Sequence, residues 1–234
     1  MLMRNNLSPE NLSEFVQYLA AKCRADGERL PSLAELSAQL GLSVATLREQ
    51  LEVARTLGFV EVKPRVGIRP LPYSFTPAVE QSLTYALMLD ATNFDAYSDL
   101  RNHIEAAYWR QAVSCLNTED HQALCALINK AEEKLHSPQV QIPHKEHREL
   151  HLSIYKRLDN PFVLGILEAY WDMYEAFGLN IYNDYGYLEK VWQYHRDMVN
   201  AICRGDSSAG YQALVDHMNL LGERQQRQSR QKFE

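Results

Sequence analysis

The chain has 234 residues, of which 46% are apolar, and a formal net charge of −6. At about 150 residues per domain, this length allows one large domain or two modest ones, and the apolar share is ample for a buried core. The sequence has no apolar run near the about 18 residues of a membrane span and no basic-then-apolar leader. These features exclude a membrane protein, so we expect a cytoplasmic protein without a membrane partner.

The charge is distributed unevenly along the chain. Residues 1–72 carry nine basic and eight acidic side chains, a net charge of +1, whereas residues 73–234 carry 15 and 22, a net charge of −7. The total charge therefore does not exclude a nucleic-acid partner for the N-terminal part. Because a net charge of +1 neutralises few phosphates, a DNA-binding protein of this kind is expected to act as a dimer.

The four cysteines are Cys23, Cys115, Cys125 and Cys203. They form no CxxC pair and lie in no secretory context, so we expect reduced, buried thiols.

The first predicted helix begins at residues 8–10, Ser-Pro-Glu, which supply an N-cap, a proline at the first helical position and an acidic first turn. It leads to Gly27. Its apolar residues recur at helical spacing, as Leu12, Phe15, Val16 and Leu19. We expect this helix to pack on the two helices that follow.

Residues 30–70 predict a helix, a tight turn, a second helix and a β-ribbon. Ser32 is a candidate N-cap, and Gly41 and Ser43 supply a helix stop and a second N-cap within three residues. The second helix has an apolar stripe of Val44, Leu47, Leu51 and Ala54, and Gly58 ends it. Residues 59–62 then alternate as a strand, residues 63–67 form a turn, and residues 68–69 return. This order is that of a winged helix-turn-helix.

A second helix that packs along one stripe can place its other face in the major groove of DNA. Thr46 and Arg48 lie off the stripe, so we predict that they contact bases or phosphates. The ribbon tip carries Arg65, which can approach the DNA backbone or the minor groove. The alternative from the pattern alone is a small helical module that binds no DNA.

Three prolines, at 70, 72 and 77, indicate a stiff linker. We therefore predict a winged helix-turn-helix domain over residues 1–70, a linker over 71–77 and a second domain over 78–234. The second domain has helical periodicity and almost no strand signal, so the fold is predicted to be mainly α, ending in an all-α antiparallel bundle. The expected helices are 78–90, 94–116, 119–136, 144–158, 161–182, 187–204 and 207–230, punctuated by Thr118-Glu119, Asn160-Pro161 and Gly205-Asp206.

Four histidines of the bundle form a candidate metal site. His147 and His151 are four residues apart on one predicted helix, so they lie on the same face. His195 and His217 flank the turn at 205–206, each about 15 Å from it along a helix, so they lie level in a helical hairpin. The alternative for each histidine alone is the commoner one, a hydrogen-bonded or surface residue that binds no metal. The other four, His103, His121, His136 and His144, are predicted to lie at the surface.

Residues 31–68, PSLAELSAQLGLSVATLREQLEVARTLGFVEVKPRVGI, resemble the DNA-binding domain of GntR-family bacterial regulators. The resemblance implies that the residues matching the family pattern bind DNA: Ser43, Thr46, Arg48 and Gly67. Ala34 and Val44 stand where the family has arginines that contact DNA. The resemblance therefore implies the fold, a double-stranded operator as partner, and altered operator contacts.

The second half resembles the FCD ligand-binding domain of the FadR branch of that family. The matching residues are Arg101, Glu105, the pair His147 and His151, Asn160, His195 and His217. The resemblance implies that the four histidines bind a divalent metal, although His147 replaces the family's aspartate. Nitrogen ligands suit Zn²⁺ or Ni²⁺. It also implies a small organic acid as effector, with Arg101 as a second contact; an ion pair at the surface or between helices is the alternative role for Arg101.

The sequence thus predicts a homodimeric transcriptional regulator without catalytic residues. Two alternatives stay open at this stage. One is a metalloenzyme in which the histidine centre activates water. The other is a regulator whose metal site only holds helices together. A cluster of aromatic residues between Tyr170 and Tyr194 is expected to form bundle core and dimer contacts, and some of them could line an effector cavity.

Overall fold

The computed structural model describes residues 11–22, 29–174, 176 and 185–231. Its contacts divide the chain into two compact units, Met1–Gln81 and Ser82–Glu234. The division falls inside α4, Thr76–Leu89, just after the predicted linker. Within the described residues, no helix combines the length and the apolar character needed to cross a bilayer.

The first unit begins with three helices, α1 (Glu14–Lys22), α2 (Leu33–Leu40) and α3 (Val44–Thr56). The predicted caps of α2 and α3 are confirmed. Ser32 accepts a hydrogen bond from the Glu35 amide, and the Glu35 carboxylate accepts one from the Ser32 amide at 2.8 Å. Gly41 ends α2 in the left-handed conformation, with φ of 67°. The predicted cap at Ser8 lies outside the described residues.

The predicted ribbon is also present. Strands β1 (Val60–Lys63) and β2 (Gly67–Pro70) pair antiparallel, with Val60 opposite Pro70 and Lys63 opposite Gly67. The inner face of the ribbon and the three helices form one hydrophobic core, which contains Phe15, Leu19, Leu30, Leu36, Leu47, Ala54, Val60 and Ile68. The unit is therefore a winged helix-turn-helix in which α1 packs on the other helices, as the sequence predicts.

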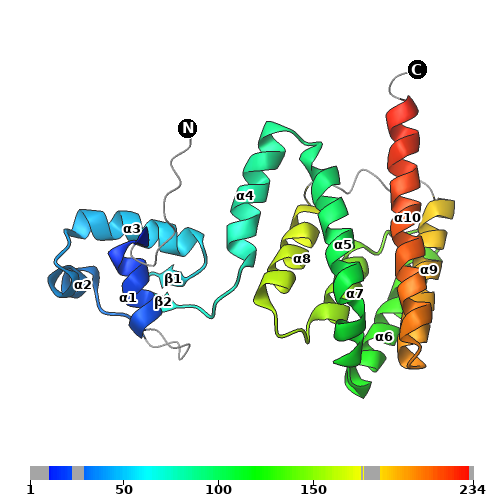
Figure 1. The fold of residues 1–234 in the computed structure, drawn as a ribbon, viewed down its shortest axis with the longest axis horizontal. Helices are drawn as coiled ribbons and strands as arrows, with labels where there is room; N and C mark the ends of the chain where they lie inside the picture. Colours follow the sequence, from blue (N-terminus) through cyan, green and yellow to red (C-terminus); the bar gives the residue numbers. More distant parts are fainter. Residues whose placement is uncertain (1–10, 23–28, 175, 177–184, 232–234) are drawn as a thin grey trace. The chain divides into compact units, whose positions relative to one another are not determined.

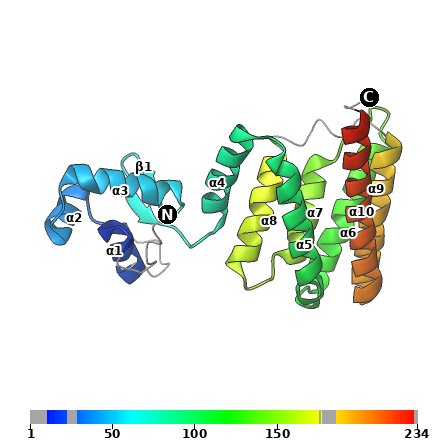
Figure 2. The same ribbon diagram turned by 45° about the horizontal axis from the view of Figure 1, so that its top comes forward.

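The second unit is an antiparallel bundle of helices that follow α4 (Figures 1 and 2). Their bounds are α5 (Asn93–Ser114), α6 (Thr118–Leu135), α7 (His144–Tyr155), α8 (Pro161–Met173), α9 (Tyr185–Cys203) and α10 (Ser207–Gln231). Asn160 caps α8 ahead of Pro161, and Gly205 has φ of 72° in the turn between α9 and α10, as predicted. The cap of α6 is Asn117 rather than Thr118. The predicted helix over 161–182 is seen to Met173, and most of its remainder lies outside the described residues.

The bundle core brings α5 and α10 into close contact. The Trp109 indole donates a hydrogen bond to the Ser207 carbonyl at 2.9 Å. A Cβ atom at Gly210 would lie 2.7 Å from the Trp109 ring, so α10 can approach this closely only because residue 210 has no side chain. This contact fixes the start of the helix that carries His217.

The cysteines differ from the prediction of buried thiols. Cys115 and Cys203 are exposed and Cys125 is half-buried; Cys23 lies outside the described residues. The thiols of Cys125, on α6, and Cys203, at the end of α9, lie 3.5 Å apart and are not bonded. The prediction of burial was wrong for all three described cysteines, because the sequence pattern of a helix does not show which of its residues the neighbouring helices cover.

Candidate metal centre and DNA-binding surface

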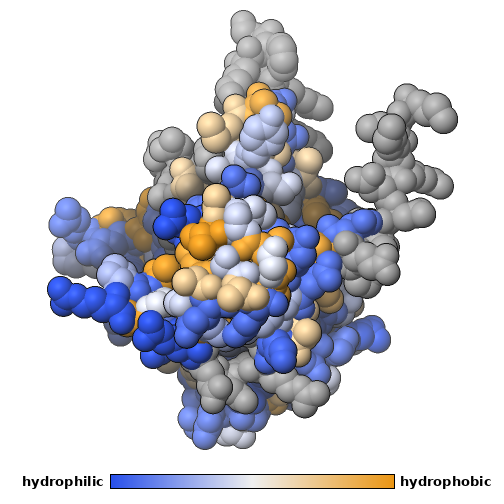
Figure 3. Space-filling view, turned by 90° about the vertical axis from the view of Figure 1, so that its left-hand side faces the viewer, coloured by the Kyte–Doolittle hydropathy of each residue, from blue (hydrophilic) through white to orange (hydrophobic). Residues whose placement is uncertain are grey.

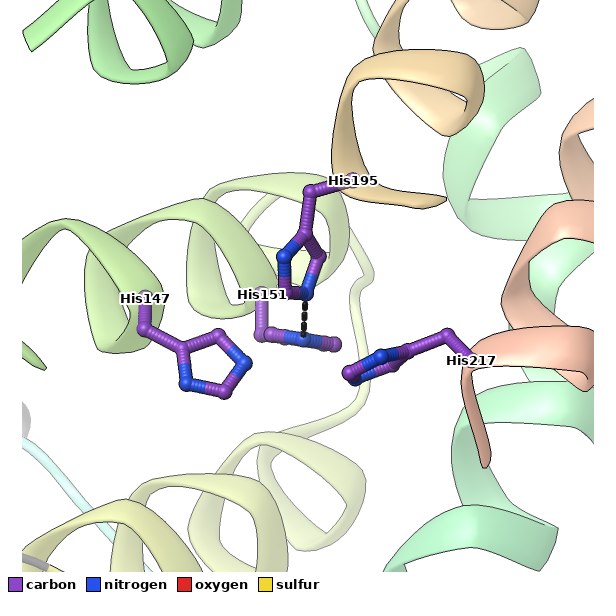
Figure 4. Close-up of side chains that lie close together, drawn as sticks. All are labelled: His147, His151, His195 and His217. Carbon is purple, nitrogen blue, oxygen red and sulfur yellow. Dashed lines mark hydrogen bonds between the residues drawn. The ribbon is translucent and has the colours of Figure 1, made fainter. Parts of the chain in front are cut away.

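Four histidine side chains meet inside the bundle (Figure 4). His147 and His151 come from α7, His195 from α9 and His217 from α10. The spacing of four residues places the first two on one face of α7, where their ring centroids are 5.1 Å apart. The helical hairpin brings His195 and His217 level, with ring centroids 4.4 Å apart. The structure therefore places all four predicted residues at one point.

The arrangement fits a metal ion. One ligand atom from each of the four side chains can be chosen so that all lie within 4.8 Å of one another. Zinc binds imidazole nitrogen at about 2.0–2.1 Å, so two ligands on opposite sides of an ion lie about 4.2 Å apart. Only small movements of the side chains would be needed. Nε2 of His151 and Nε2 of His195 are already 3.0 Å apart.

Several ring nitrogens of the cluster are buried and lack a hydrogen-bond partner. They are Nε2 of His147, Nδ1 of His195, and Nδ1 and Nε2 of His217. A buried polar atom without a partner costs free energy, and native proteins seldom retain several in one place. A bound cation would accept the lone pair of one nitrogen from each ring, so the cluster fits a metal-binding role better than a purely structural one.

The electrostatic environment keeps these rings neutral. Burial lowers the pKa of each of the four histidines well below its usual value. Neighbouring charges also lower the pKa of His147 and His151: for His147 the next largest cause is His151, and for His151 it is Arg101. For His217 the Glu105 charge acts in the opposite direction and raises the pKa. A neutral imidazole has a free lone pair at neutral pH, which is the form that binds metal.

Arg101 and Glu105, both on α5, form a buried layer behind His151. The Arg101 Nε and the Glu105 carboxylate are 2.9 Å apart, and the Glu105 carboxylate lies 3.1 Å from Nδ1 of His151. Burial raises the pKa of Glu105, and the Arg101 charge opposes this rise. When His151 carries its proton on Nδ1, it donates to Glu105 and turns the Nε2 lone pair toward the cluster, as metal ligands commonly do.

Arg101 itself is only 1% exposed, so the predicted alternative of a surface ion pair is wrong. Its guanidinium lies 4.9 Å from the Tyr170 ring centre and 5.1 Å from that of Trp171, and Nη2 lies 2.8 Å from Nδ1 of His151. Its ion pair with Glu105 is within one helix, not between helices. Arg101 therefore contributes a fixed positive charge beside the histidines.

Trp171 belongs to the aromatic cluster of residues 170–194, some of which were expected to line an effector cavity, and it is 1% exposed. Its ring centre lies 4.7 Å from that of His147 and 4.9 Å from that of His151. The aromatic cluster predicted as core thus also forms a wall of the histidine site. The pattern of α8 indicates a buried residue here but not which neighbour it meets.

The remaining histidines lie elsewhere. His103 and His136 are exposed, as predicted, and His121 is half-buried. His144, predicted to lie at the surface, is half-buried at the first position of α7.

The predicted DNA-binding residues lie on α3 and at the ribbon of the first unit. The Ser43 hydroxyl caps α3 by accepting from the Thr46 amide at 3.0 Å, and Arg48 is exposed one turn further on. Arg65 is exposed at the ribbon tip with φ of 65°, and Gly67 begins β2 with φ of 92°. All five residues thus lie at α3 or at the ribbon, the two elements on which the DNA-binding prediction was based.

Helix α2 itself carries no basic residue. In Figure 3, apolar side chains gather near the middle of the face turned to the viewer, and hydrophilic ones surround them. Ala34 on α2 is exposed, and Val44 at the start of α3 is half-buried. These are the two positions at which the family pattern described above has arginines. Among the described residues of the first unit, the exposed cations are Lys22, Arg29, Arg48, Arg55, Lys63, Arg65 and Arg69.

The comparisons with known proteins identify the second unit. Residues 97–220 match the FCD domain, which is more than half of the chain. The chain belongs to the FCD domain family. The FCD domain thus includes all four histidines, Arg101 and Glu105.

The relatives found align with most of the chain. It is 23% identical over 218 residues to the HTH-type transcriptional regulator YcbG of Bacillus subtilis, covering 93% of this chain and 89% of that one. It is 26% identical over 200 residues to the HTH-type transcriptional regulator YieP of Escherichia coli, covering 80% and 81%. The structure of Streptococcus agalactiae GntR has the same fold, with a TM-score of 0.63, 18% identity and coverage of 91% and 96%. The chain is accordingly a GntR-family transcriptional regulator with an FCD domain.

Proposed function

We propose that this regulator holds a divalent transition metal ion between His147, His151, His195 and His217, and that a small carboxylate bound beside the ion alters operator binding. The observation that carries this proposal is the convergence of four buried, neutral imidazoles from three helices, with several ring nitrogens unpartnered. Four nitrogen ligands favour Zn²⁺ or Ni²⁺ over Mg²⁺ or Ca²⁺. The ion would supply a positive charge and coordination positions for an anion.

The charge of the site favours an anionic effector. Four neutral ligands leave the double positive charge of the ion uncompensated, and the buried charges of Arg101 and Glu105 offset each other. Nη2 of Arg101 lies 2.8 Å from Nδ1 of His151, and the same guanidinium would offer the carboxylate a second contact by charge-assisted hydrogen bonding. An ion that accepts five or six ligands keeps a position open for the carboxylate, whereas a closed tetrahedral site would be structural.

The DNA-binding part of the proposal rests on the first unit. Arg48 on α3 and Arg65 on the ribbon are exposed, and Ser43, Thr46 and Gly67 shape the same surface. Because residues 1–72 carry a net charge of only +1, two copies are needed to neutralise enough phosphates. We therefore propose a homodimer that binds two half-sites of a near-palindromic operator. The linker over 71–77 would join the two domains of each copy.

The experiment measures operator binding by the full chain in defined metal states. Operators are first selected from random duplexes, and binding is then followed by fluorescence anisotropy. The protein is metal-free, Zn²⁺-loaded or Ni²⁺-loaded, with and without members of a panel of mono-, di- and tricarboxylates. We expect at least one carboxylate to change the dissociation constant about tenfold, a coupling of about 1.4 kcal/mol, only when metal is bound.

Two outcomes would contradict the proposal. If no metal state and no carboxylate changes operator binding, the site is not a sensor. If removal of metal abolishes the helical circular dichroism of the second unit, the ion is structural. The variant His103→Ala, which removes an exposed histidine of α5, is the matched control and should respond as the wild type does.

A further inference from the structure

The Arg29 side chain lies on the β-ribbon, although this residue precedes α2 in the chain. A Cβ atom at Gly67 would lie 2.8 Å from Nε of Arg29 and 3.3 Å from its Cζ and Nη2. Apart from Gly67 and its neighbours in the chain, these are the three heavy atoms nearest to that position. All three belong to the guanidinium group, which therefore covers Gly67 at the start of β2.

The backbone holds Arg29 in this place. The Leu30 amide donates a hydrogen bond to the Ile68 carbonyl at 2.9 Å, so residue 30 is fixed beside β2. Leu30 and Ile68 are both buried in the core of the first unit. Successive side chains of an extended chain point to opposite faces, so Arg29 and Gly67 lie on the outer face of the ribbon. Arg29 is exposed there.

The same outer face carries further charges. Arg69 lies two residues after Gly67 on β2, and Lys63 lies directly opposite Gly67 on β1. Lys63 pairs with Glu61 at 2.6 Å. Neither Arg29 nor Arg69 forms an ion pair with a carboxylate in the described part of the chain. The positive charges of these two arginines are therefore accessible to an anion.

Glu35 is the acidic residue that lies near enough to Arg29 to be affected by its charge. The hydroxyl and the amide of Ser32 lower the pKa of Glu35 most, and the Arg29 charge lowers it further. Both groups of Ser32 donate to the Glu35 carboxylate, at 2.7 and 2.8 Å. This carboxylate is thus engaged in the cap of α2 and does not hold the guanidinium in an ion pair.

We propose that Arg29 binds a phosphate of the DNA backbone, and that Gly67 is the seat that holds its guanidinium on the outer face of the ribbon. This inference rests on the DNA-binding part of the proposed function. A guanidinium binds phosphate oxygens through two parallel N–H donors. Contact with the ribbon restricts the side chain before DNA arrives, which reduces the entropy lost on binding.

A phosphate contact of this kind contributes affinity without reading the base sequence. Residues 1–72 carry a net charge of only +1, so one more phosphate contact in each copy is a substantial part of the attraction to DNA. The glycine acts indirectly, because any side chain at position 67 would displace the arginine.

The test measures how DNA binding by the full-length protein depends on salt. Fluorescence anisotropy is recorded with the selected operator and with a duplex of unrelated sequence, each at several salt concentrations. Arg29→Met removes the charge and keeps an unbranched stem, whereas Arg29→Lys keeps the charge. Arg55→Met is the matched control, since Arg55 is exposed but pairs with Glu52 at 2.5 Å. Circular dichroism checks that each variant folds.

We expect Arg29→Met to weaken binding to both duplexes by the same factor. The slope of log affinity against log salt should fall by about 0.9 for each lost contact, or about 1.8 for a dimer. Arg29→Lys and Arg55→Met should keep the wild-type slope. An unchanged slope in Arg29→Met would overturn the phosphate contact. An equal loss in Arg29→Lys would also overturn it, because the positive charge would then not be responsible.

The role of Gly67 is tested by combining substitutions. Gly67→Ala should lower the slope in the wild type, and should lower it no further in Arg29→Met, where the contact is already lost. A further loss in Arg29→Met would overturn the role of Gly67 as a seat. If Gly67→Ala does not fold, the two Arg29 variants decide the proposal. If the wild type binds neither duplex, the DNA-binding part of the proposed function itself fails, a result distinct from an unchanged Arg29→Met.

Discussion

Nε2 of His151 and Nε2 of His195 lie 3.0 Å apart, although the two residues are 44 positions apart in the chain. The contact joins α7 to α9 at the centre of the FCD domain, and the rings of His147 and His217 complete the cluster around it. Two neutral imidazoles this close can share one proton or one metal ion. The properties of the domain in solution should therefore depend on pH and on metal.

The stability of the metal-free protein should fall when the pH is lowered below about 6.5. Burial lowers the pKa of the four histidines in the folded state, so the unfolded chain binds protons that the folded chain does not. Each such proton lowers the free energy of unfolding by about 1.4 kcal/mol per pH unit below 6.5. Glu105, whose pKa is raised by burial, acts in the opposite direction. Urea unfolding at pH 7.5, 6.5 and 5.5 measures the net effect of these groups on the free energy of unfolding.

The variant His217→Gln removes one buried histidine, so its unfolding should take up about one proton fewer below pH 6.5. The free energy of unfolding should then change less steeply with pH than in the wild type. The control His103→Gln removes an exposed histidine and should leave the dependence unchanged. A free energy of unfolding that stays constant between pH 7.5 and pH 5.5 would show that these rings are not buried in the neutral form.

Arg48→Ala should weaken operator binding. Arg48 is exposed on α3, and loss of a base contact costs about 1–3 kcal/mol, while loss of a phosphate contact lowers the salt dependence by about one ion. The matched control is Arg55→Ala, which removes the same charge from the last turn of α3, where Arg55 pairs with Glu52. Anisotropy titrations at several salt concentrations distinguish the two roles. Equal affinities for Arg48→Ala and the wild type would contradict the proposed docking.

Much of this arrangement could be predicted from local sequence. The caps Ser32 and Ser43, and Asn160 ahead of α8, determine where helices begin, because each satisfies free amides within three residues. The level positions of His195 and His217 follow from their equal distance to the Gly205 turn. These features depend on residues that are close in the sequence, so the sequence alone predicts them.

Contacts between helices could not be predicted in this way. The burial of Arg101 depends on Tyr170 and Trp171 of α8, and no pattern within α5 indicates which helix covers its guanidinium. His144, predicted to lie at the surface, lines a cavity that residues of α9 complete. The rotation of each helix about its axis is fixed by tertiary contacts, which the periodicity of one helix does not specify.

Cys125 and Cys203 should form a disulfide when the protein is treated with diamide, which takes one hydrogen from each thiol and is reduced to a hydrazine. Their sulfur atoms are 3.5 Å apart. Burial and the neighbouring Cys125 raise the pKa of Cys203 to about 11, so oxidation should quicken as the pH rises and more thiolate forms. Peptide mass spectrometry identifies the bond. Cross-linking through the exposed Cys115 instead would contradict the geometry.

Limited proteolysis should cut the chain between residues 71 and 75, ahead of α4. Tyr73 is 55% exposed in a segment without helix or strand, and proteases bind extended chain. Tyr85 is the internal control, since it is 66% exposed but lies within α4. Brief chymotrypsin treatment followed by mass spectrometry should find cleavage after Tyr73 first. Earlier cleavage after Tyr85 would place the domain boundary inside the helix.

The metal content of the purified full-length protein tests the central claim most directly. The wild type, His195→Ala and His103→Ala are loaded with Zn²⁺ or Ni²⁺, dialysed and measured by elemental analysis. The four-histidine centre predicts about one ion per chain in the wild type and in His103→Ala, and a clear loss in His195→Ala, because removal of one ligand leaves three. An equal metal content in His195→Ala and the wild type, or none in any of the three, would contradict the account.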